Sequence, residues 1–256
     1  TVSTTPPSTT TPSATPSTTT PVTTTVATTT ETTTSPEVTT STPSLEEIRL
    51  VTMKTFRDVL SNFRHGVTVV RTTYEGELTE AAMSFTVTGT EEVSGIKCWA
   101  VDIVLSSAET GNQTVKAWVG IDDGKIYRLS IPGQGVLEYP QSDSIGQMLL
   151  AGVLAPFTMF QGSIEETELK VTTEGIVSIK GWNVLDSGRT TVTISGRDYS
   201  AYYAKASSTS PELGVQEVEF TLANLLKDRW YVVYVAWVDN EGNTGEIELT
   251  ELEPAT

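Results

Sequence analysis

The sequence predicts a mostly β domain of the α+β class: an antiparallel meander with an N-terminal helix and an inserted apolar helix, behind a disordered Thr/Ser/Pro stalk. Three observations predict this fold. Residues 1–44 contain 22 Thr, 7 Ser and 7 Pro, and so have too little apolar surface to fold. Short runs rich in β-branched and aromatic residues follow, joined by tight turn sequences. Residues 144–164 then carry no charge at all.

The tract of residues 1–44 is the most distinctive feature of the chain. Ser/Thr-rich sequence with recurring proline is typical of an O-glycosylated stalk, because proline favours extended geometry and glycans on neighbouring threonines stiffen it. At about 3.1 Å per residue, the tract reaches at most roughly 140 Å. An unglycosylated flexible linker is the alternative, and both are spacers rather than sites. The candidate acceptors are Thr9, Thr10, Thr18, Thr19, Thr23 and Thr24, with Asn112 as a separate N-glycosylation candidate.

An amphipathic helix is expected where the tract ends. Ser44 followed by Glu47 has the capping-box spacing, and Gly66 is a stop signal. The expected helix has about 20 residues. A cation at its C-terminal end would suit the helix dipole, which gives His65 a structural role. The apolar stripe consists of Leu45, Ile48, Phe56, Val59, Leu60 and Phe63.

Period-two runs then predict about five strands before the uncharged segment and about six after it. The turns between them, such as residues 93–95 and 122–125, are too short for parallel crossovers, so the meander is antiparallel. We expect one β-rich domain over residues 45–254. A boundary near 163–166, which would make 165–254 a separate sandwich-like domain, stays open at this point.

The uncharged segment is expected to form the inserted helix. Asp143 is a suitable N-cap, and the break falls near Ala155 and Pro156. A transmembrane span is disfavoured, because glycine, glutamine and proline interrupt the segment. A helix that is apolar nearly all round is buried or lies against an apolar ligand. The predicted ligand-lining residues are Met148, Leu149, Val153, Leu154, Phe157 and Phe160, together with Trp99 and Trp118.

This order of elements resembles the lipoprotein-carrier group of the LolA and LppX type. The stretches that carry the resemblance are FRDVLSNFRHGVTVVRTTYEGEL, KAWVGIDDGKIYRLSI and the 143–162 segment, and WVGIDDG has the form of an aromatic-rich turn common in that group. The resemblance covers residues 45–254. It implies a curved half-barrel sheet that wraps helices and holds acyl chains between them. The Thr-rich stalk and acidic composition are closer to an archaeal-type surface protein.

Charge and composition exclude several function classes. Outside the stalk, 30 acidic residues oppose 16 basic residues, a net charge of −14, which argues against binding to nucleic acid or to anionic lipid surfaces. Solubility explains this charge, and divalent-cation binding is the alternative. The single cysteine, Cys98, permits no intrachain disulfide and favours a prokaryotic surface over a eukaryotic secretory route.

No catalytic motif is present, so we expect no enzyme activity, no cofactor and no metal centre. Cys98 lies inside a strand-like run and is expected to be a buried apolar residue. The Asp239–Asn243 stretch offers oxygen ligands for Ca²⁺ but lacks the spacing of an EF-hand loop, so a plain hairpin turn is favoured.

Two functions fit these features. The first is an extracellular, non-enzymatic binding module, anchored to the cell surface through a segment not present in this chain and holding an apolar small molecule or lipid. The alternative is a structural or adhesive surface protein or filament subunit, whose partners are further copies of itself or other surface proteins.

Overall fold

The computed structural model describes residues 45–46, 55–109, 111–153, 169–210, 214–226 and 229–255. All of them belong to the second of two compact units, residues 42–256. The expected stalk lies outside the described residues, and so does the 163–166 stretch that was the candidate domain boundary.

The described residues form mostly strands, with two short helices. Strand β1 (Leu45–Glu46) and helix α1 (Phe56–Leu60) come first. The first set of strands is β2 (Phe63–Tyr74), β3 (Glu77–Val93), β4 (Ile96–Ser107), β5 (Gly111–Gly120), β6 (Ile126–Ile131) and β7 (Gly135–Glu138). Helix α2 (Gln141–Val153) follows. The second set is β8 (Leu169–Thr172), β9 (Ile176–Ile179), β10 (Trp182–Ile194), β11 (Arg197–Ser208), β12 (Val215–Leu226), β13 (Arg229–Asp239) and β14 (Thr244–Pro254).

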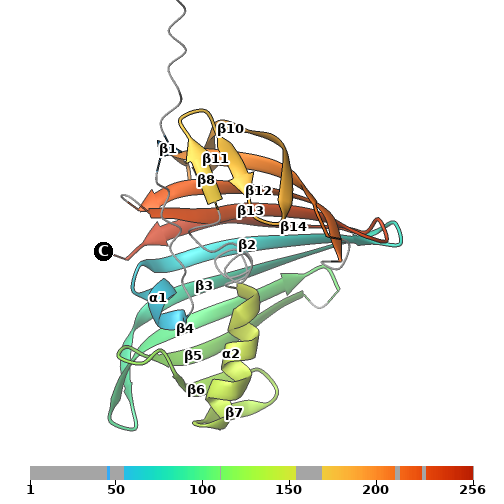
Figure 1. Ribbon diagram of the computed structural model, residues 1–256. Coiled ribbons are helices and arrows are strands. Elements are labelled where there is room, and N and C mark those ends of the chain that lie inside the picture. The colour runs from blue at the N-terminus through green and yellow to red at the C-terminus, as the bar shows by residue number, and fades with distance from the viewer. Residues whose placement is uncertain are drawn as a thin grey trace, which may run out of the picture. The chain divides into compact units, whose positions relative to one another are not determined.

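All of these strands lie in one antiparallel sheet of 14 strands. Strands β8 to β14 follow one another across it, β14 pairs with β2, and β2 to β7 complete it (Figure 1). The two edges are β7 and the two-residue β1, which pairs with β8. The predicted antiparallel meander is confirmed. The second set of strands does not form a sheet of its own, because β14 joins it to β2.

Two-residue turns set the register of three hairpins. Glu75–Gly76, Ser94–Gly95 and Ser195–Gly196 all have positive φ at both residues. This is the turn geometry whose twist matches that of antiparallel strands, and glycine at the second position adopts it without strain. The turn at Ser195–Gly196 separates β10 from β11.

The long N-terminal helix predicted from residue 45 is wrong. Leu45 and Glu46 pair with β8, and the helix that forms is α1, five residues long. Its capping box is made by Thr55 and Asp58 rather than by Ser44: the Asp58 amide donates to Thr55 Oγ1 at 3.2 Å, and the Thr55 amide donates to Asp58 Oδ2 at 3.0 Å. Phe63 begins β2, where the β-branched residues that follow favour a strand. His65 therefore lies in β2 and caps no helix; its Nδ1 is 2.8 Å from Thr86 Oγ1.

Helix α2 begins two residues before the expected N-cap, Asp143, and is described as far as Val153. It is not buried on all sides: Leu150 is fully buried, whereas Met148 is 76% exposed. The alternative, contact of the helix with an apolar ligand, stays a prediction. Pro156, the expected break, lies outside the described residues. No helix in the described part of the chain combines the length and hydropathy needed to cross a membrane.

Both helices pack on the same face of β2–β6, which we call the helix face (Figure 1). Phe56 and Leu60 of α1 and Leu150 of α2 share a buried cluster with Phe85 and Ile103. The cluster extends into the second set of strands, where Tyr231 packs edge-on against Phe63 with ring centroids 5.9 Å apart. A second cluster, centred on Tyr202 and Phe220, lies within β8–β13.

Candidate functional site

Helix α2 is fixed to the sheet by hydrogen bonds to one strand residue. Ser142 Oγ donates to the Ile126 carbonyl at 2.6 Å, and the Ile126 amide donates to Asp143 Oδ1 at 3.0 Å. Gly146 lets the helix approach closely, because a Cβ there would collide with the Ile126 side chain. The polar first turn therefore docks α2 on β6, and Leu150 reaches the core one to two turns later.

Only two of the predicted ligand-lining residues within residues 148–160 have described side chains. Met148 points to solvent, while Leu149 packs partly against the core. Val153 belongs to α2, but its side chain is outside the description, as are Leu154, Phe157 and Phe160 altogether. The apolar lining predicted for residues 148–160 stays a prediction.

A recess opens on the helix face beside Trp99. It has a volume of 370 Å³ and is lined by Leu60, Arg64, Val87, Thr88, Gly89, Thr90, Trp99 and Ala255. The register of β3 against β4 shifts between Val87 and Gly89, which breaks the regular ladder at this point. Thr90 lies directly opposite Trp99 on β4, so the two side chains share the side of the sheet on which the recess opens. Of the predicted lining residues, Trp99 alone among those described lines this recess.

Trp118 lies on the opposite side of the sheet, which we call the outer face. It is paired with Ala100, one residue along β4 from Trp99, and adjacent strand residues point to opposite faces. Its Nε1 donates to Glu91 Oε2 at 2.7 Å, and Lys116 Nζ lies 4.8 Å from the ring centroid. The hydrogen bonds from Trp118 and Lys116 lower the pKa of Glu91. Trp99 and Trp118 therefore cannot line a common cavity.

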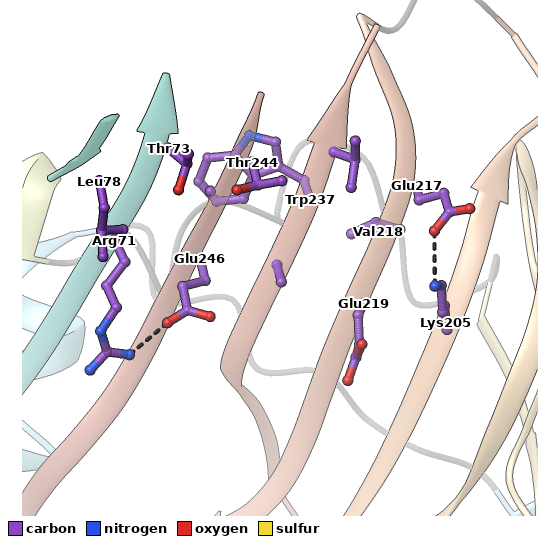
Figure 2. A pocket seen from close by; sticks show the side chains of 13 residues that line it. Arg71, Thr73, Leu78, Lys205, Glu217, Val218, Glu219, Trp237, Thr244 and Glu246 are labelled. Atoms are coloured by element: carbon purple, nitrogen blue, oxygen red, sulfur yellow. Dashed lines mark hydrogen bonds and ion pairs between the residues drawn. The ribbon is translucent and has the colours of Figure 1, made fainter. Parts of the chain in front are cut away.

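A groove on the outer face crosses the junction between the two sets of strands. It has a volume of 310 Å³ and follows β13 between β12 and β14 (Figure 2). Arg71 lies at one end, where its Nη1 donates to Glu246 Oε1 at 2.6 Å and its Nε donates to Glu80 Oε2 at 2.6 Å. Lys205 lies at the other end, with its Nζ 2.9 Å from Glu217 Oε2. We call this feature the outer groove.

Tyr234 lies under the carboxylates of the outer groove. Its hydroxyl donates to Glu246 Oε2 at 3.4 Å. Burial, followed by the negative charges of Glu246 and Glu219, raises the pKa of Tyr234 to about 12. The carboxylates around Arg71 in turn raise the pKa of its guanidinium, which therefore stays charged. The outer groove is a region of net negative potential that contains two paired cations.

Sequence reasoning missed the outer groove, although each strand carried part of the signal. Acidic residues alternate with apolar residues in β12 and β14, as the outward side of a strand should. The sequence pattern does not reveal that β14 pairs with β2. Nothing in the sequence therefore indicates that Arg71 and Glu246 are close to each other.

The remaining residues singled out from the sequence have structural surroundings. Cys98 is fully buried, and burial raises the pKa of its thiol, as expected of an apolar core residue. Asp239 Oδ1 accepts from the amides of Glu241 and Asn243 at 2.8 and 2.9 Å, which makes the stretch a hairpin turn. No group of metal-ligating side chains is found among the described residues. Asn112 is exposed on β5, and its Oδ1 accepts from Ser106 Oγ at 2.5 Å.

Comparisons with known proteins bear on the fold only. No protein-family model and no curated protein matches the sequence. Among solved structures, MucB is 14% identical, with 78% of this chain and 57% of MucB covered and a TM-score of 0.32. The MucA/MucB complex of Pseudomonas aeruginosa is 13% identical, with 75% and 53% covered and a TM-score of 0.31. This chain therefore spans little more than half of the MucB chains.

A LolA superfamily protein from Nitrosomonas europaea is 10% identical, with 77% of this chain and 87% of that chain covered and a TM-score of 0.27. The lipoprotein-carrier group that the sequence resembles is thus represented among the similar structures. These identities and TM-scores are low, so the functional proposals rest on the sequence and geometry of this chain alone.

Proposed function

We propose that this chain is an extracellular, surface-tethered, non-enzymatic binding module whose recess beside Trp99 holds an apolar or lipid-like ligand. The recess itself carries the proposal. Its 370 Å³ falls within the range of roughly 300–1,000 Å³ typical of small-molecule sites. The Thr/Ser/Pro composition of residues 1–44 supports the tethered, extracellular part of the proposal.

The lining of the recess favours an amphipathic ligand. Leu60, Val87 and Trp99 supply the apolar surface, and the indole gives a flat, rigid contact for an acyl chain. Arg64 also lines the recess and is ion-paired with Glu253, with Nη2 3.0 Å from Oε2. A ligand with an acyl chain and a small anionic head would match both the apolar surface and this guanidinium.

Titration of the purified full chain with dansylundecanoic acid tests the proposal. The variant Thr90→Leu enlarges a side chain that lines the recess; Thr90 is exposed and directly opposite Trp99, so we expect the variant to fold normally. We expect saturable dansyl fluorescence with the native chain and at least a tenfold weaker affinity with Thr90→Leu. The matched control is Glu77→Leu, which adds the same side chain at the exposed start of the same strand. Equal affinity in all three chains would contradict the proposal.

A structural or adhesive role is the second candidate, and the edge of the sheet favours it. Leu45 and Glu46, which follow the Thr/Ser/Pro tract directly, pair with Thr172 and Val171 of β8. A sheet edge that accepts a short strand can also accept one from a neighbouring chain. Sizing chromatography with light scattering on the full chain tests this role, and a strict monomer at high concentration would argue against it.

A further inference from the structure

A row of charged side chains crosses the outer face from β10 to β3. Cross-strand register places each member directly opposite the next on the neighbouring strand. The members are Asp186, Lys205, Glu219, Ala236, Glu246, Arg71 and Glu80. Directly opposite residues on neighbouring antiparallel strands share a face and lie within reach of one another. The signs alternate along the row, with one exception at its centre.

Ala236 is that exception. It stands between Glu219 on β12 and Glu246 on β14, at the position where alternation requires a cation. Neighbouring strands are about 4.8 Å apart, so the strands that carry the two carboxylates are roughly 10 Å apart. The small side chain of Ala236 lines the outer groove, as Glu219 and Glu246 do.

The two cations of the row already have carboxylate partners. Arg71 binds Glu80 and Glu246, and Lys205 binds Glu217. Glu219 is exposed and makes no hydrogen bond or ion pair within the described part of the chain (Figure 2). The pKa of Tyr234 beneath the groove is raised mainly by burial, and the negative charges of Glu246 and Glu219 raise it further.

We propose that the outer groove binds a single lysine or arginine side chain of a protein partner. Its aliphatic stem lies along Ala236 and Val238, and its charge lies between Glu219 and Glu246. With this cation bound, negative and positive charges alternate across all seven strands of the row. The net charge of −14 outside the tract also attracts a basic partner over longer range.

The pattern favours a side chain on a protein over a free polyamine. Lys205 and Arg71 lie in the same row, each two strands away from Ala236 on either side. A single cationic side chain whose neighbours in the partner are uncharged therefore fits beside Ala236. A polyamine would bring further amines close to the positive charges of Lys205 and Arg71. The site lies on the opposite face from the Trp99 recess, so a negative result for one proposal does not affect the other.

An NMR titration of the ¹⁵N-labelled full chain at low salt tests the inference. The probe is the peptide Gly-Ser-Gly-Lys-Gly-Ser-Gly with blocked ends, and spermidine is a second arm. We expect saturable shifts at the amides of residues 236, 219 and 246 with the peptide. Glu219→Gln should weaken this binding at least fivefold. Ala236→Lys, which places a cation in the gap, should abolish it and raise the melting temperature.

The matched control is Glu174→Gln, which removes one exposed carboxylate at the β8–β9 turn and should bind the peptide like the native chain. Shifts spread over the whole acidic surface, or equal affinity in Glu219→Gln and Glu174→Gln, would overturn the inference. Tighter binding of spermidine than of the peptide at the same residues would overturn the assignment to a protein partner. If Ala236→Lys fails to fold, the Glu219→Gln comparison decides alone.

Discussion

The contact between Gly245 and Trp237 allows a quantitative test of the packing beneath the outer groove. The two residues are directly opposite each other on β14 and β13. A Cβ at position 245 would collide with the indole, with Cε2 only 2.6 Å away, and φ at this glycine is not positive. The substitution Gly245→Ala therefore tests steric fit without backbone strain.

We expect Gly245→Ala to destabilise the domain. Overpacking costs about 1–3 kcal/mol. The reduced entropy of the unfolded chain offsets about 0.4–1 kcal/mol of this. A net loss of about 1–2 kcal/mol corresponds to a fall of roughly 2–8 °C in melting temperature for a domain of this size. Thermal and urea unfolding followed by circular dichroism measure it. Gly89→Ala is the matched control, because no atom lies within 4 Å of a Cβ there, and it should be neutral or slightly stabilising.

A double-mutant cycle makes the reasoning refutable. In a Trp237→Leu background the indole is gone, so Gly245→Ala should cost little or become stabilising. The coupling free energy between the two substitutions should then be about 1–3 kcal/mol. Additive effects would show that the indole does not occupy this space, and would refute the packing argument.

Three further predictions concern other parts of the domain. Burial and nearby carboxylates raise the pKa of Tyr234 to about 12, above the ordinary tyrosine value of about 10, so its share of the stability is present below pH 10 and is lost as pH rises towards 12. Tyr234→Phe should flatten this alkaline loss of stability in pH-dependent urea unfolding. Ser142→Ala leaves the buried Ile126 carbonyl without its side-chain donor and should cost about 1–3 kcal/mol, whereas Ser144→Ala, at an exposed position in the same helix, should cost less by the same assay. Deleting residues 1–43 should shift the melting temperature by no more than about 2 °C. Deletion through Glu46 also removes β1 and should lower the melting temperature by a further 2–4 °C or so. Equal melting temperatures for the two truncations would show that the β1–β8 pairing adds no stability.

Much of the local structure was predictable from the sequence, because strands and tight turns have local signals. The run of β-branched and apolar residues from Ile96 to Ser107 forms β4, and Ser94–Gly95 forms the expected turn. The long N-terminal helix failed because helical spacing between residues 45 and 63 is only a weak constraint. The β-branched residues from Val67 onward and the pairing of Leu45 with Thr172 favoured strands instead.

The apolar-ligand site was predictable only in part. Trp99 was singled out for its residue type and does line a recess, but the bulge at Val87 and Gly89 that accompanies the recess has no clear sequence signature. Trp118 was singled out on the same grounds and lies on the other face. Alternation assigns two residues to opposite faces only when they share a strand, and these two lie on neighbouring strands whose register is unknown from sequence.

The outer groove shows what a non-local contact adds. Arg71 and Glu246 are 175 residues apart in the sequence and 2.6 Å apart in the structure, because β14 pairs with β2. Each strand alone carries an ordinary solvated charge on its outward side. Only their common register turns these charges into an alternating row, and only then does Ala236 become a missing cation rather than one more small residue. Replacing Arg71 with glutamine should therefore do two things: free Glu246 and Glu80 from their shared partner, and strengthen binding of a lysine peptide at Ala236. Weaker binding in Arg71→Gln would mean that Arg71 holds the groove open rather than competing for its carboxylates.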